Sequence, residues 1–493
     1  MPLRRAALLT LSIGGLWLGS GSARAGGMFL GTHGARPTAR GGAFVAGADD
    51  LNAIYYNPAG VVLSHPDGEG WSVLFDAGLV LQNVAYTRND AGIDRPTVRG
   101  DGGAIGGAPF IIPQLAFARK WNKPWGGLAI GMGLWIPYTG LNRYPEPSYD
   151  TEEARRQVPD VAPQRYQLIG LHEGSLTRAT LMAVLNPVVS FSLLGDKLQL
   201  GIGPQLMLLW FRAKLMLNGC PQVMCPPDNP DYDALVVAQA FAPVPSLNLG
   251  AIYRPIDMLK VGLAFQLPFF VRSAYGTVDT RLPSSELFNG ASVEGRNASL
   301  SMNLPPVRRL GAELTTWQKR LRIELAYTAE FWSIQDRVIV SPQDVSLVNV
   351  KGFDTYKLGT VSIDRQMQTT HAVHLGIEAT LWKYLGARLG GMFESGAMPD
   401  ATFTILSPDS SKGMISIGAF FPGVQFASAE WRFDLGYSRI IQPDRVIAPE
   451  DSRLAPQNPI RPDIGTGPGQ GGIGGGRYEV SYDIITLGLS VTR

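Results

Sequence analysis

From Trp71 to the end of the chain, apolar and polar residues alternate with a period of two. The clearest example runs from Leu321 to Phe331, and residues 385–394 and 429–438 repeat it. One face of the first segment would carry Leu321, Ile323, Leu325, Tyr327, Ala329 and Phe331, and the other Arg322, Glu324, Thr328 and Glu330. Successive side chains of a β-strand point to opposite faces, so the sequence predicts an all-β protein whose strands each have one apolar and one polar face.

The polar face of these strands carries both signs of charge next to glycine. A soluble β-sandwich also alternates, but its polar face meets bulk water. Mixed charges indicate instead a crowded barrel lumen. The candidate lumen charges are Arg322, Glu324, Glu330, Arg388, Glu430, Arg432 and Asp434. They either include a cation for the carboxylate of a ligand or, as we favour, pair with one another and with an N-terminal plug.

Short and long connections alternate along the chain, as in outer-membrane barrels. Tight turns at 194–197, 255–257 and 318–320 take turns with long loops such as 215–243 and 333–368. We expect about fourteen antiparallel strands, near residues 71–87, 113–119, 125–136, 177–193, 198–214, 244–254, 258–273, 302–317, 321–334, 369–382, 385–397, 412–422, 428–441 and 477–492. An even number returns both termini to the periplasm, and closure leaves no unpaired strand edge in lipid.

The first 25 residues have the pattern of a secretory signal peptide. Arg4 and Arg5 precede an apolar run from Ala6 to Leu18, and Ala23-Arg-Ala25 fits a cleavage site. The alternative, a membrane anchor, would need a longer apolar run. We therefore expect residues 1–25 to be removed, with the mature chain beginning at Gly26.

The segment Gly41 to Gly60 is rich in Gly and Ala and is interrupted by Asp49, Asp50 and Pro58. It is too short to build a core of its own, so other parts of the chain must surround it. We expect residues 26–70 to form a plug, or hatch, inside a transmembrane barrel of residues 71–493.

Composition excludes some partners, and the two cysteines suggest a local bridge. Charged residues make up 17% of the chain and the net charge is +2, which does not suggest nucleic-acid binding. Cys220 and Cys225 lie five residues apart, so in an oxidising compartment they would close a small disulfide loop. A metal site, the alternative, would need further ligands, and no His lies nearby.

Several segments resemble the FadL-type outer-membrane transporters of long-chain fatty acids and aromatic hydrocarbons. They are Asn57-Pro58-Ala59, Pro113 to Ala118, Asn303 to Pro306 leading into Leu310 to Trp332, and Gly476 to Leu489. The resemblance implies a fourteen-stranded barrel with an N-terminal hatch, capture of a hydrophobic ligand between two outer loops, and sideways release through a gap in the wall. It implies no cofactor. The chain departs from the family in ending with Val491-Thr-Arg493, without a terminal aromatic residue, and in its cysteine pair.

The resemblance also assigns positions. The hatch would include Met28, Phe29, Leu30, Asn57, Pro58 and Ala59. The capture loops would be 215–243, with Leu235, Val236, Val237 and Phe241, and 275–302, with Leu282, Leu287 and Phe288. The wall gap would lie near Gly131, Gly133, Pro137 and Gly140.

Two of these assignments have structural alternatives. Pro137 removes a hydrogen bond from the strand ladder and is expected at an edge or a bulge, but it could equally mark the start of a loop outside the membrane. The apolar stretch 235–241 suits a binding surface, or a loop that folds inward onto the barrel rim. Met28, Phe29 and Leu30 could respond to ligand, although packing alone is the simpler role.

No sequence motif points firmly to an enzyme. His371 and His374 are three residues apart on a strand, so their side chains face opposite ways and cannot share a metal. Residues 467–472 match a dinucleotide-binding pattern by letters, but no helix follows. We therefore expect passive uptake of a hydrophobic small molecule across a bacterial outer membrane by a monomer in contact with lipid and lipopolysaccharide. The alternatives are an aqueous porin with a constricted lumen and a barrel enzyme that hydrolyses lipids.

Overall fold

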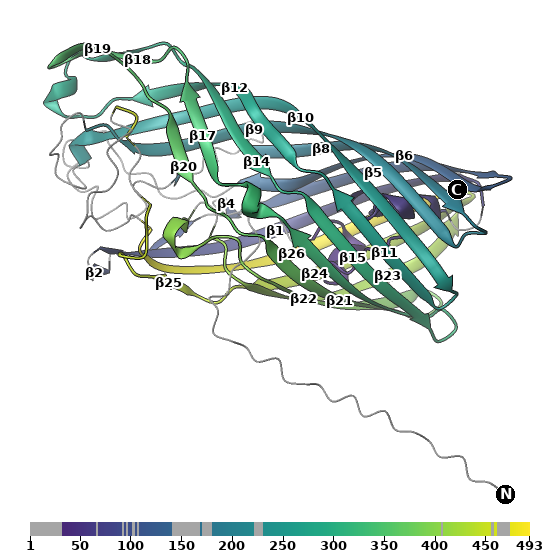
Figure 1. The fold of residues 1–493 in the computed structure, drawn as a ribbon. Helices are drawn as coiled ribbons and strands as arrows, with labels where there is room; N and C mark the ends of the chain where they lie inside the picture. The colour runs from purple at the N-terminus through teal and green to yellow at the C-terminus, as the bar shows by residue number, and fades with distance from the viewer. Residues whose placement is uncertain are drawn as a thin grey trace, which may run out of the picture.

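A closed antiparallel β-barrel of fourteen wall strands forms the body of the molecule (Figure 1). The structure is a computed structural model, and it describes residues 32–65, 68–90, 93–94, 97–100, 104–105, 108–140, 168–169, 180–220, 230–405, 408–454, 458–460 and 474–493. The first and last wall strands pair from Ser72–Thr492 to Arg88–Gly476, which closes the ring. The predicted fold class is confirmed.

Most wall strands are continuous, and their bounds follow. They are β1 (Gly70–Asp90), β5 (Ala108–Lys123), β6 (Gly126–Gly140), β8 (Thr180–Leu193), β9 (Leu198–Asn218), β10 (Asp233–Ile256), β22 (Leu385–Glu394), β23 (Lys412–Phe426), β24 (Ala429–Ile441) and β26 (Gly476–Thr492). The other wall strands consist of two pieces each: β11 (Leu259–Gln266) with β12 (Phe269–Arg281), β14 (Asn297–Leu304) with β15 (Val307–Thr316), β16 (Leu321–Glu330) with β17 (Arg337–Pro342), and β20 (Val361–Asp364) with β21 (Thr370–Trp382).

Short elements extend the wall or stand apart from it. The strands that extend it are β2 (Ile93–Asp94), β3 (Val98–Gly100), β4 (Ala104–Ile105), β7 (Leu168–Ile169) and β25 (Arg445–Ile447). A separate sheet consists of β13 (Ser292–Glu294), β18 (Ser346–Val350) and β19 (Phe353–Lys357). Single 3₁₀ turns are η3 (Pro230–Tyr232), η4 (Glu286–Phe288), η5 (Trp332–Ile334) and η6 (Asp400–Thr402). None of the helices in the described part of the chain is long and apolar enough to cross a membrane.

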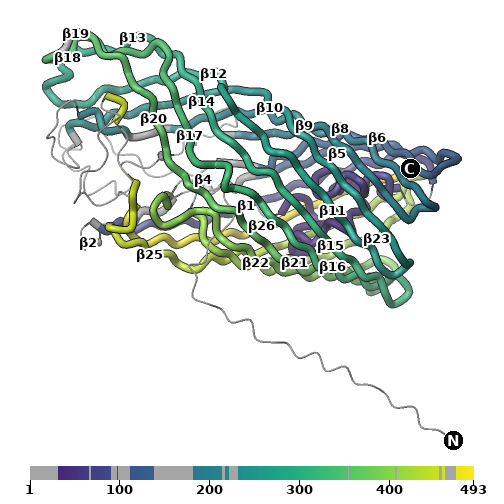
Figure 2. Tube along the Cα trace, viewed as in Figure 1, coloured from purple at the N-terminus to yellow at the C-terminus, as the bar shows by residue number. Residues whose placement is uncertain are grey.

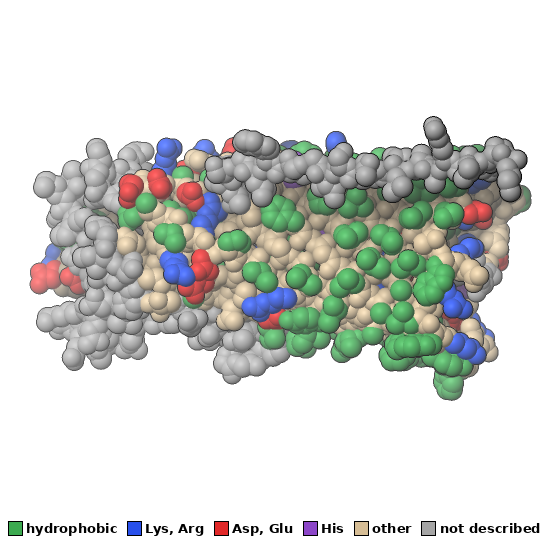
Figure 3. Space-filling view, turned by 90° about the horizontal axis from the view of Figure 1, so that it is seen from below, with side chains coloured by type: hydrophobic (Ala, Val, Ile, Leu, Met, Phe, Trp, Pro, Cys, Tyr) green, Lys and Arg blue, Asp and Glu red, His purple; other side chains and the backbone are tan. Residues whose placement is uncertain are grey.

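The two ends of the barrel differ. Short turns such as Ala427-Ser428 and 317–320 lie at the end that holds the C-terminus, which we call the turn end, and the long connections lie at the opposite loop end (Figure 1). Apolar side chains cover much of the outer wall toward the turn end (Figure 3). Large exposed aromatic side chains border the turns, namely Trp125, Trp317, Trp382, Tyr384 and Phe426. Such an apolar band with an aromatic girdle is the surface of a membrane barrel.

Residues 32–65, which we call the inner segment, lie inside the barrel near the turn end (Figure 2). They form the helices α1 (Ala35–Ala39) and α2 (Ala53–Tyr56) and the 3₁₀ helix η1 (Pro58–Leu63). Nearly all of these residues are buried. The segment has no core of its own and packs on the barrel wall.

Four neighbouring strands are interrupted next to one another along the wall. The breaks fall at 267–268, 305–306, 331–336 and 365–369. Side chains replace part of the lost ladder: Gln335 Oε1 accepts the backbone N–H of Asn303 at 2.7 Å. This matters because an unpaired backbone group in lipid costs several kcal/mol.

One predicted loop is wrong. Residues 215–243 were expected to be a loop, but Leu235, Val236, Val237 and Phe241 lie in β10, paired with β9 on one side and β12 on the other. Pro243 and Pro245 had suggested a strand boundary. They are tolerated because β10 changes partner there: its pairs with β12 end at Phe241, and those with β11 begin at Asn248, so no N–H is needed on that side.

Candidate functional site

Buried ion pairs join the inner segment to the wall. Glu313 of β15 and Glu324 of β16 lie directly opposite each other and face the lumen, fully buried. Arg40 of the inner segment places Nη2 2.9 Å from a carboxylate oxygen of each. Glu324 Oε1 also accepts the backbone N–H groups of Val45 and Ala46, at 2.6 and 2.7 Å. The repulsion between the two carboxylates is therefore offset by a cation and N–H donors that the inner segment supplies.

A second set of ion pairs involves Arg36 of α1. Its Nε and Nη2 bind the two oxygens of Glu378 at 2.8 and 2.9 Å, and Nη1 lies 2.8 Å from Asp49. Arg322 of β16 lies 2.8 Å from the same Asp49. Burial would raise the pKa of Asp49, but Arg322, Arg36 and Lys260 outweigh it and hold this pKa well below its ordinary value. Asp49 therefore stays ionised inside the barrel.

The predicted lumen charges fall into two groups. Arg322, Glu324, Arg388, Arg432 and Asp434 belong to these ion pairs, with Arg388 lying 2.7 Å from Glu378 and 2.6 Å from Asp434. Glu330 and Glu430 have other surroundings: Glu330 accepts the indole N–H of Trp332 at 2.7 Å, and Glu430 lines a cavity at the turn end together with Arg36, Asp49, Arg322 and Arg432. That cavity has a volume of about 370 Å³.

The Asn57-Pro58-Ala59 sequence fixes the inner segment without charge. Asn57 is fully buried, and its Nδ2 donates to the carbonyls of Val45 and Ala251 at 2.9 and 3.1 Å. Its Oδ1 accepts the N–H of Ala59 and caps η1. On the wall, a Cβ on Gly201 would come 2.3 Å from the backbone of Pro58, so glycine is required for this approach.

An apolar cavity lies at the loop end. It has a volume of about 40 Å³ and almost no polar lining. Val236 and Ala238 of β10, Leu282 and Phe288 of the connection after β12, and Leu347 of β18 contribute to its lining. Of the predicted capture residues, Val236, Leu282 and Phe288 line it, and Leu287 packs against the same apolar cluster. Leu235 and Val237 alternate to the other face of β10, and Phe241 is exposed.

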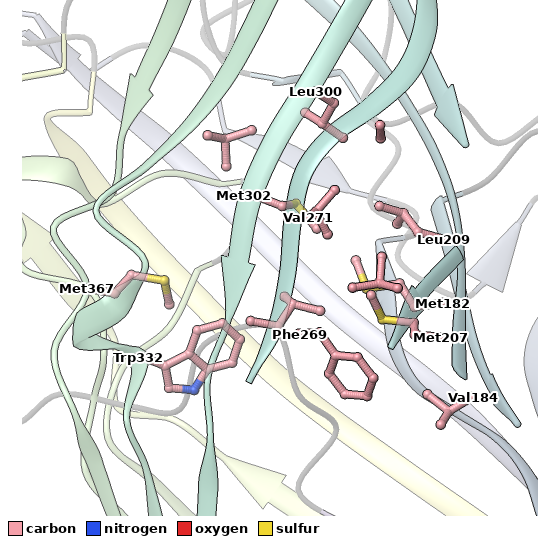
Figure 4. Close-up of a cluster of buried hydrophobic side chains, with 14 of the residues drawn as sticks. Met182, Val184, Met207, Leu209, Phe269, Val271, Leu300, Met302, Trp332 and Met367 are labelled. Carbon is pink, nitrogen blue, oxygen red and sulfur yellow. The ribbon is translucent and has the colours of Figure 1, made fainter. Parts of the chain in front are cut away.

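A layer of apolar side chains fills the lumen between the loop-end cavity and the inner segment (Figure 4). We call it the waist, and it consists of Met182, Met207, Leu209, Phe269, Met302, Trp332 and Met367. The inward residues of β9 show the order: Gly201 contacts the inner segment, Met207 belongs to the waist, and Leu217 lines the cavity. Methionine is unbranched and flexible, so this layer can rearrange around a guest.

The wall is incomplete between β5 and β6. Their pairing runs from Lys123–Gly126 to Leu115–Leu134 and stops there. Within the described residues, 110–114 of β5 then pair only with β1, while β6 continues beside β8. A bulge between Trp135 and Tyr138 interrupts the β6–β8 register at Pro137. We call residues 110–114 and 135–140 the unpaired window.

Of the four residues predicted for the wall gap, two precede Leu134, where the pairing of β5 with β6 ends, and two follow it. Gly131 pairs with Ala118 and Val188, and Gly133 pairs with Ala116 and Asn186, so both lie in regular sheet. Pro137 and Gly140 lie in the unpaired window. Gly133 has another role, because a Cβ there would come 3.0 Å from Ile54 of the inner segment.

A small cavity of about 20 Å³ lies directly behind the unpaired window. It is lined by residues of the inner segment, β1, β5, β6 and β26: Thr32, His33, Gly34, Asp76, Gly78, Val80, Ile112, Pro113, Gln114, Trp135, Ile136, Ile484 and Thr486. One side of the cavity lies against His33 and Gly34, which directly precede α1, and another side lies where the pairing of β5 with β6 ends.

Some predicted residues cannot be placed. Met28, Phe29, Leu30 and the signal peptide lie outside the described residues, as does Cys225. Cys220 is disulfide-bonded, but its pairing with Cys225 stays a prediction. No group of three or more His, Cys, Asp or Glu side chains in the described ranges is arranged to hold a metal ion.

Four residues of the buried ion pairs were not predicted from the sequence, namely Arg36, Arg40, Glu313 and Glu378. A signal for the two glutamates existed, because the tight turn at 317–320 places Glu313 opposite Glu324 once both strands are extended. Two facing carboxylates require a cation from outside the strand pair. Nothing local pointed to Arg36 or Arg40 as that cation.

Comparison with known proteins gives a consistent result. The family model described as outer membrane protein transport protein (OMPP1/FadL/TodX) matches residues 164–466. A Pseudomonas aeruginosa FadL homologue has a similar structure, with a TM-score of 0.69 at 16% identity over 94% of this chain and 99% of that one. The P. putida toluene transporter TodX (TM-score 0.59, 14% identity, 94% and 99% covered) and the Ralstonia pickettii toluene transporter TbuX (0.58, 14%, 94% and 98%) share the fold. No curated protein matches the sequence.

Proposed function

Because the chain belongs to the outer membrane protein transport protein family (OMPP1/FadL/TodX), whose members are channels of the bacterial outer membrane for hydrophobic compounds, we propose that it takes up such a compound by passive diffusion. The cargo enters at the loop end, passes the waist, and leaves sideways through the unpaired window while the inner segment blocks the straight path. Family members are non-enzymatic, so the lipid-hydrolysing alternative falls away.

The apolar loop-end cavity supports the capture step. Its lining is apolar and formed by residues such as Val236, Leu282 and Phe288. An apolar cavity at the entrance withdraws a hydrophobic solute from water and so offsets the barrier of the polar outer leaflet. Two structural neighbours are described as toluene transporters, which supports a small apolar cargo.

The waist supports passage toward the inner segment. One contiguous apolar cluster runs from Val236 and Phe288 through Met207 and Met302 to Ile54 of the inner segment. A hydrophobic solute can move along such a cluster by displacing flexible methionines, without entering water. An ion would lose its hydration shell there, so this layer also acts against ion leakage.

The unpaired window is the observation that carries the proposal. Pairing of β5 with β6 stops at Leu115–Leu134, beside a bulge that holds Pro137. The inner segment, by contrast, is tied to the wall by Arg36, Arg40 and Asn57. A cargo that reaches the inner segment therefore meets less resistance toward the lipid than toward the periplasm.

Removal of residues 32–63 tests the proposal against an aqueous porin. The intact protein in planar bilayers should pass little ion current, and the truncated protein should conduct strongly. Cells that express the intact chain should take up toluene faster than cells without it. A large, steady current from the intact protein, together with no gain in toluene uptake, would favour the porin.

A further inference from the structure

Two buried polar atoms without a partner belong to side chains that line the small cavity behind the unpaired window. They are His33 Nε2 and Gln114 Oε1, and no described group hydrogen-bonds to either of them. The exposed fractions of the two residues are 5% and 4%. Buried polar atoms normally find partners, so two such residues in the lining of one cavity indicate a polar guest.

The rest of each side chain is held in place. Gln114 Nε2 donates to Asn52 Oδ1 at 2.9 Å, which leaves its carbonyl oxygen as the free acceptor. The His33 ring packs edge-on against Tyr55 at 4.7 Å, and its backbone N–H donates to the hydroxyl of Tyr56. Thr486 lies between Gly78 of β1 and Gly436 of β24, with its methyl group toward Gly78 and its hydroxyl toward Gly436, so it lines the cavity with the methyl group.

The lining of the cavity offers no partner for an anion. No lysine or arginine is among the residues that line it. Asp76 is 2% exposed, accepts the backbone N–H of Ala35 at 3.0 Å and forms no ion pair with any described cation. Burial, with a contribution from Arg309, lowers the pKa of His33 to about 3, so the imidazole is neutral at neutral pH. A carboxylate in this cavity would meet the Gln114 carbonyl without a compensating cation.

The remaining lining is apolar and faces the window. Val80, Ile112, Trp135, Ile136 and Ile484 surround the polar atoms on the side where β5 and β6 separate. A volume of about 20 Å³ accommodates one water-sized group. The cavity thus fits the polar end of a molecule whose apolar part lies in the window.

We propose that this cavity binds the hydroxyl group of an uncharged amphipathic cargo, such as an alcohol or a phenol, at the exit. The inference rests on the proposed uptake function and names the cargo class that the exit prefers. The cargo hydroxyl donates its proton to Gln114 Oε1, and its oxygen accepts from His33 Nε2. The alkyl or aryl part extends between β5 and β6 toward the lipid.

The hydrogen bonds predict a selectivity order. An alkane leaves both polar atoms unpaired, and a carboxylate brings a charge that no residue of the lining offsets. Each satisfied buried hydrogen bond contributes a free energy that corresponds to roughly a five- to ten-fold preference. The alcohol should therefore enter faster than the alkane or the acid of the same chain length.

Initial uptake of 1-octanol, octane and octanoate by cells that express the full chain tests this order. Background uptake by cells without the chain is subtracted. The wild type should favour 1-octanol about five- to ten-fold over octane. Gln114→Leu should abolish this preference while octane uptake persists, and Thr486→Val, which keeps a methyl group toward the cavity, should retain it.

Gln205→Leu is the matched control. Gln205 is also a buried lumen glutamine with an unpartnered Oε1, but it bonds to Asn186 and does not line this cavity. It should keep the wild-type preference.

The outcomes separate the two proposals. If the wild type takes up all three probes equally, or if Gln114→Leu keeps the preference for alcohol, the cavity holds only water and the inference is wrong while uptake stands. If the wild type takes up none of the probes above background, the proposed function itself fails.

Discussion

Glu313 and Glu324 face each other across β15 and β16, and one nitrogen of Arg40 lies 2.9 Å from both carboxylates. All three side chains are fully buried. Since Arg40 belongs to the inner segment and the glutamates to the wall, this contact holds the inner segment in the barrel. It is also the contact whose loss leaves the largest uncompensated charge.

Arg40→Met should release the inner segment. Removing one partner of a buried ion pair costs about 3–5 kcal/mol because the remaining charge is left unpaired. Conductance in planar bilayers should rise, and the segment should become accessible to protease. The double variant Arg40→Met, Glu324→Gln should restore low conductance, since Glu313 keeps its ion pairs with Arg322 and Lys260. Equal leakage from the single and double variants would contradict this account.

Pro137→Ala should slow the uptake of hydrophobic compounds. Alanine supplies a backbone N–H and relaxes the bulge, so β6 can pair further with its neighbours and narrow the unpaired window. Toluene uptake should fall several-fold while the barrel stays folded, as shown by its heat-modifiable mobility in gels. Pro187→Ala is the control, because Pro187 of β8 lies opposite Met132, outside the window. Undiminished uptake in Pro137→Ala would place the exit elsewhere.

Val236→Asp should reduce capture, and Val237→Asp should not. Val236 lines the loop-end cavity, whereas Val237 is its neighbour on the opposite face of β10. An unpaired carboxylate in an apolar cavity carries a desolvation penalty that amounts to at least a ten-fold loss of affinity. Uptake at low external toluene should fall for Val236→Asp only. A similar fall in both variants would indicate damage to the strand rather than loss of a binding site.

Acidification should loosen the inner segment through His33. Its pKa is about 3 when docked and 6.5 ordinarily, so a released segment takes up a proton at a pH where the docked segment does not. The stability of the docked state is therefore complete above about pH 6.5 and declines toward pH 3, by roughly 2 kcal/mol at pH 4.5. Conductance should rise between pH 7.5 and 4.5, and less so in His33→Phe. An identical rise in both proteins would assign the response to other groups.

The alternation of the sequence was sufficient to predict the barrel, because side-chain direction in a strand depends only on position. Leu325 is 57% exposed and its neighbour Glu324 is fully buried, as the pattern requires. The pattern did not reveal where a strand changes partner. Pro243 and Pro245 therefore suggested a loop, although β10 continues through both.

The candidate site was only partly predictable. Arg388 was predicted from the alternation, and Asn57 and Val236 from the family resemblance, but their partners depend on which wall positions the inner segment reaches. A signal lay in the inward-facing glycines Gly201 and Gly262, where a Cβ would collide with the inner-segment backbone. The small cavity behind the unpaired window had no signature in the sequence, since its residues come from five separate parts of the chain.

The ion pairs of the inner segment also constrain the order of assembly. Arg36 and Arg40 are made at the start of the chain, whereas Glu313 and Glu324 follow Arg40 by 273 and 284 residues and Glu378 follows Arg36 by 342 residues. During export, the inner segment therefore has none of these wall carboxylates to bind until most of the hairpins exist. Insertion of the segment and closure of β1 on β26 must then be late events. A nascent chain that stalls before Glu313 would carry Arg40 without its carboxylate partners for a periplasmic chaperone to shield, while Arg36 can still pair with Asp49 of its own segment.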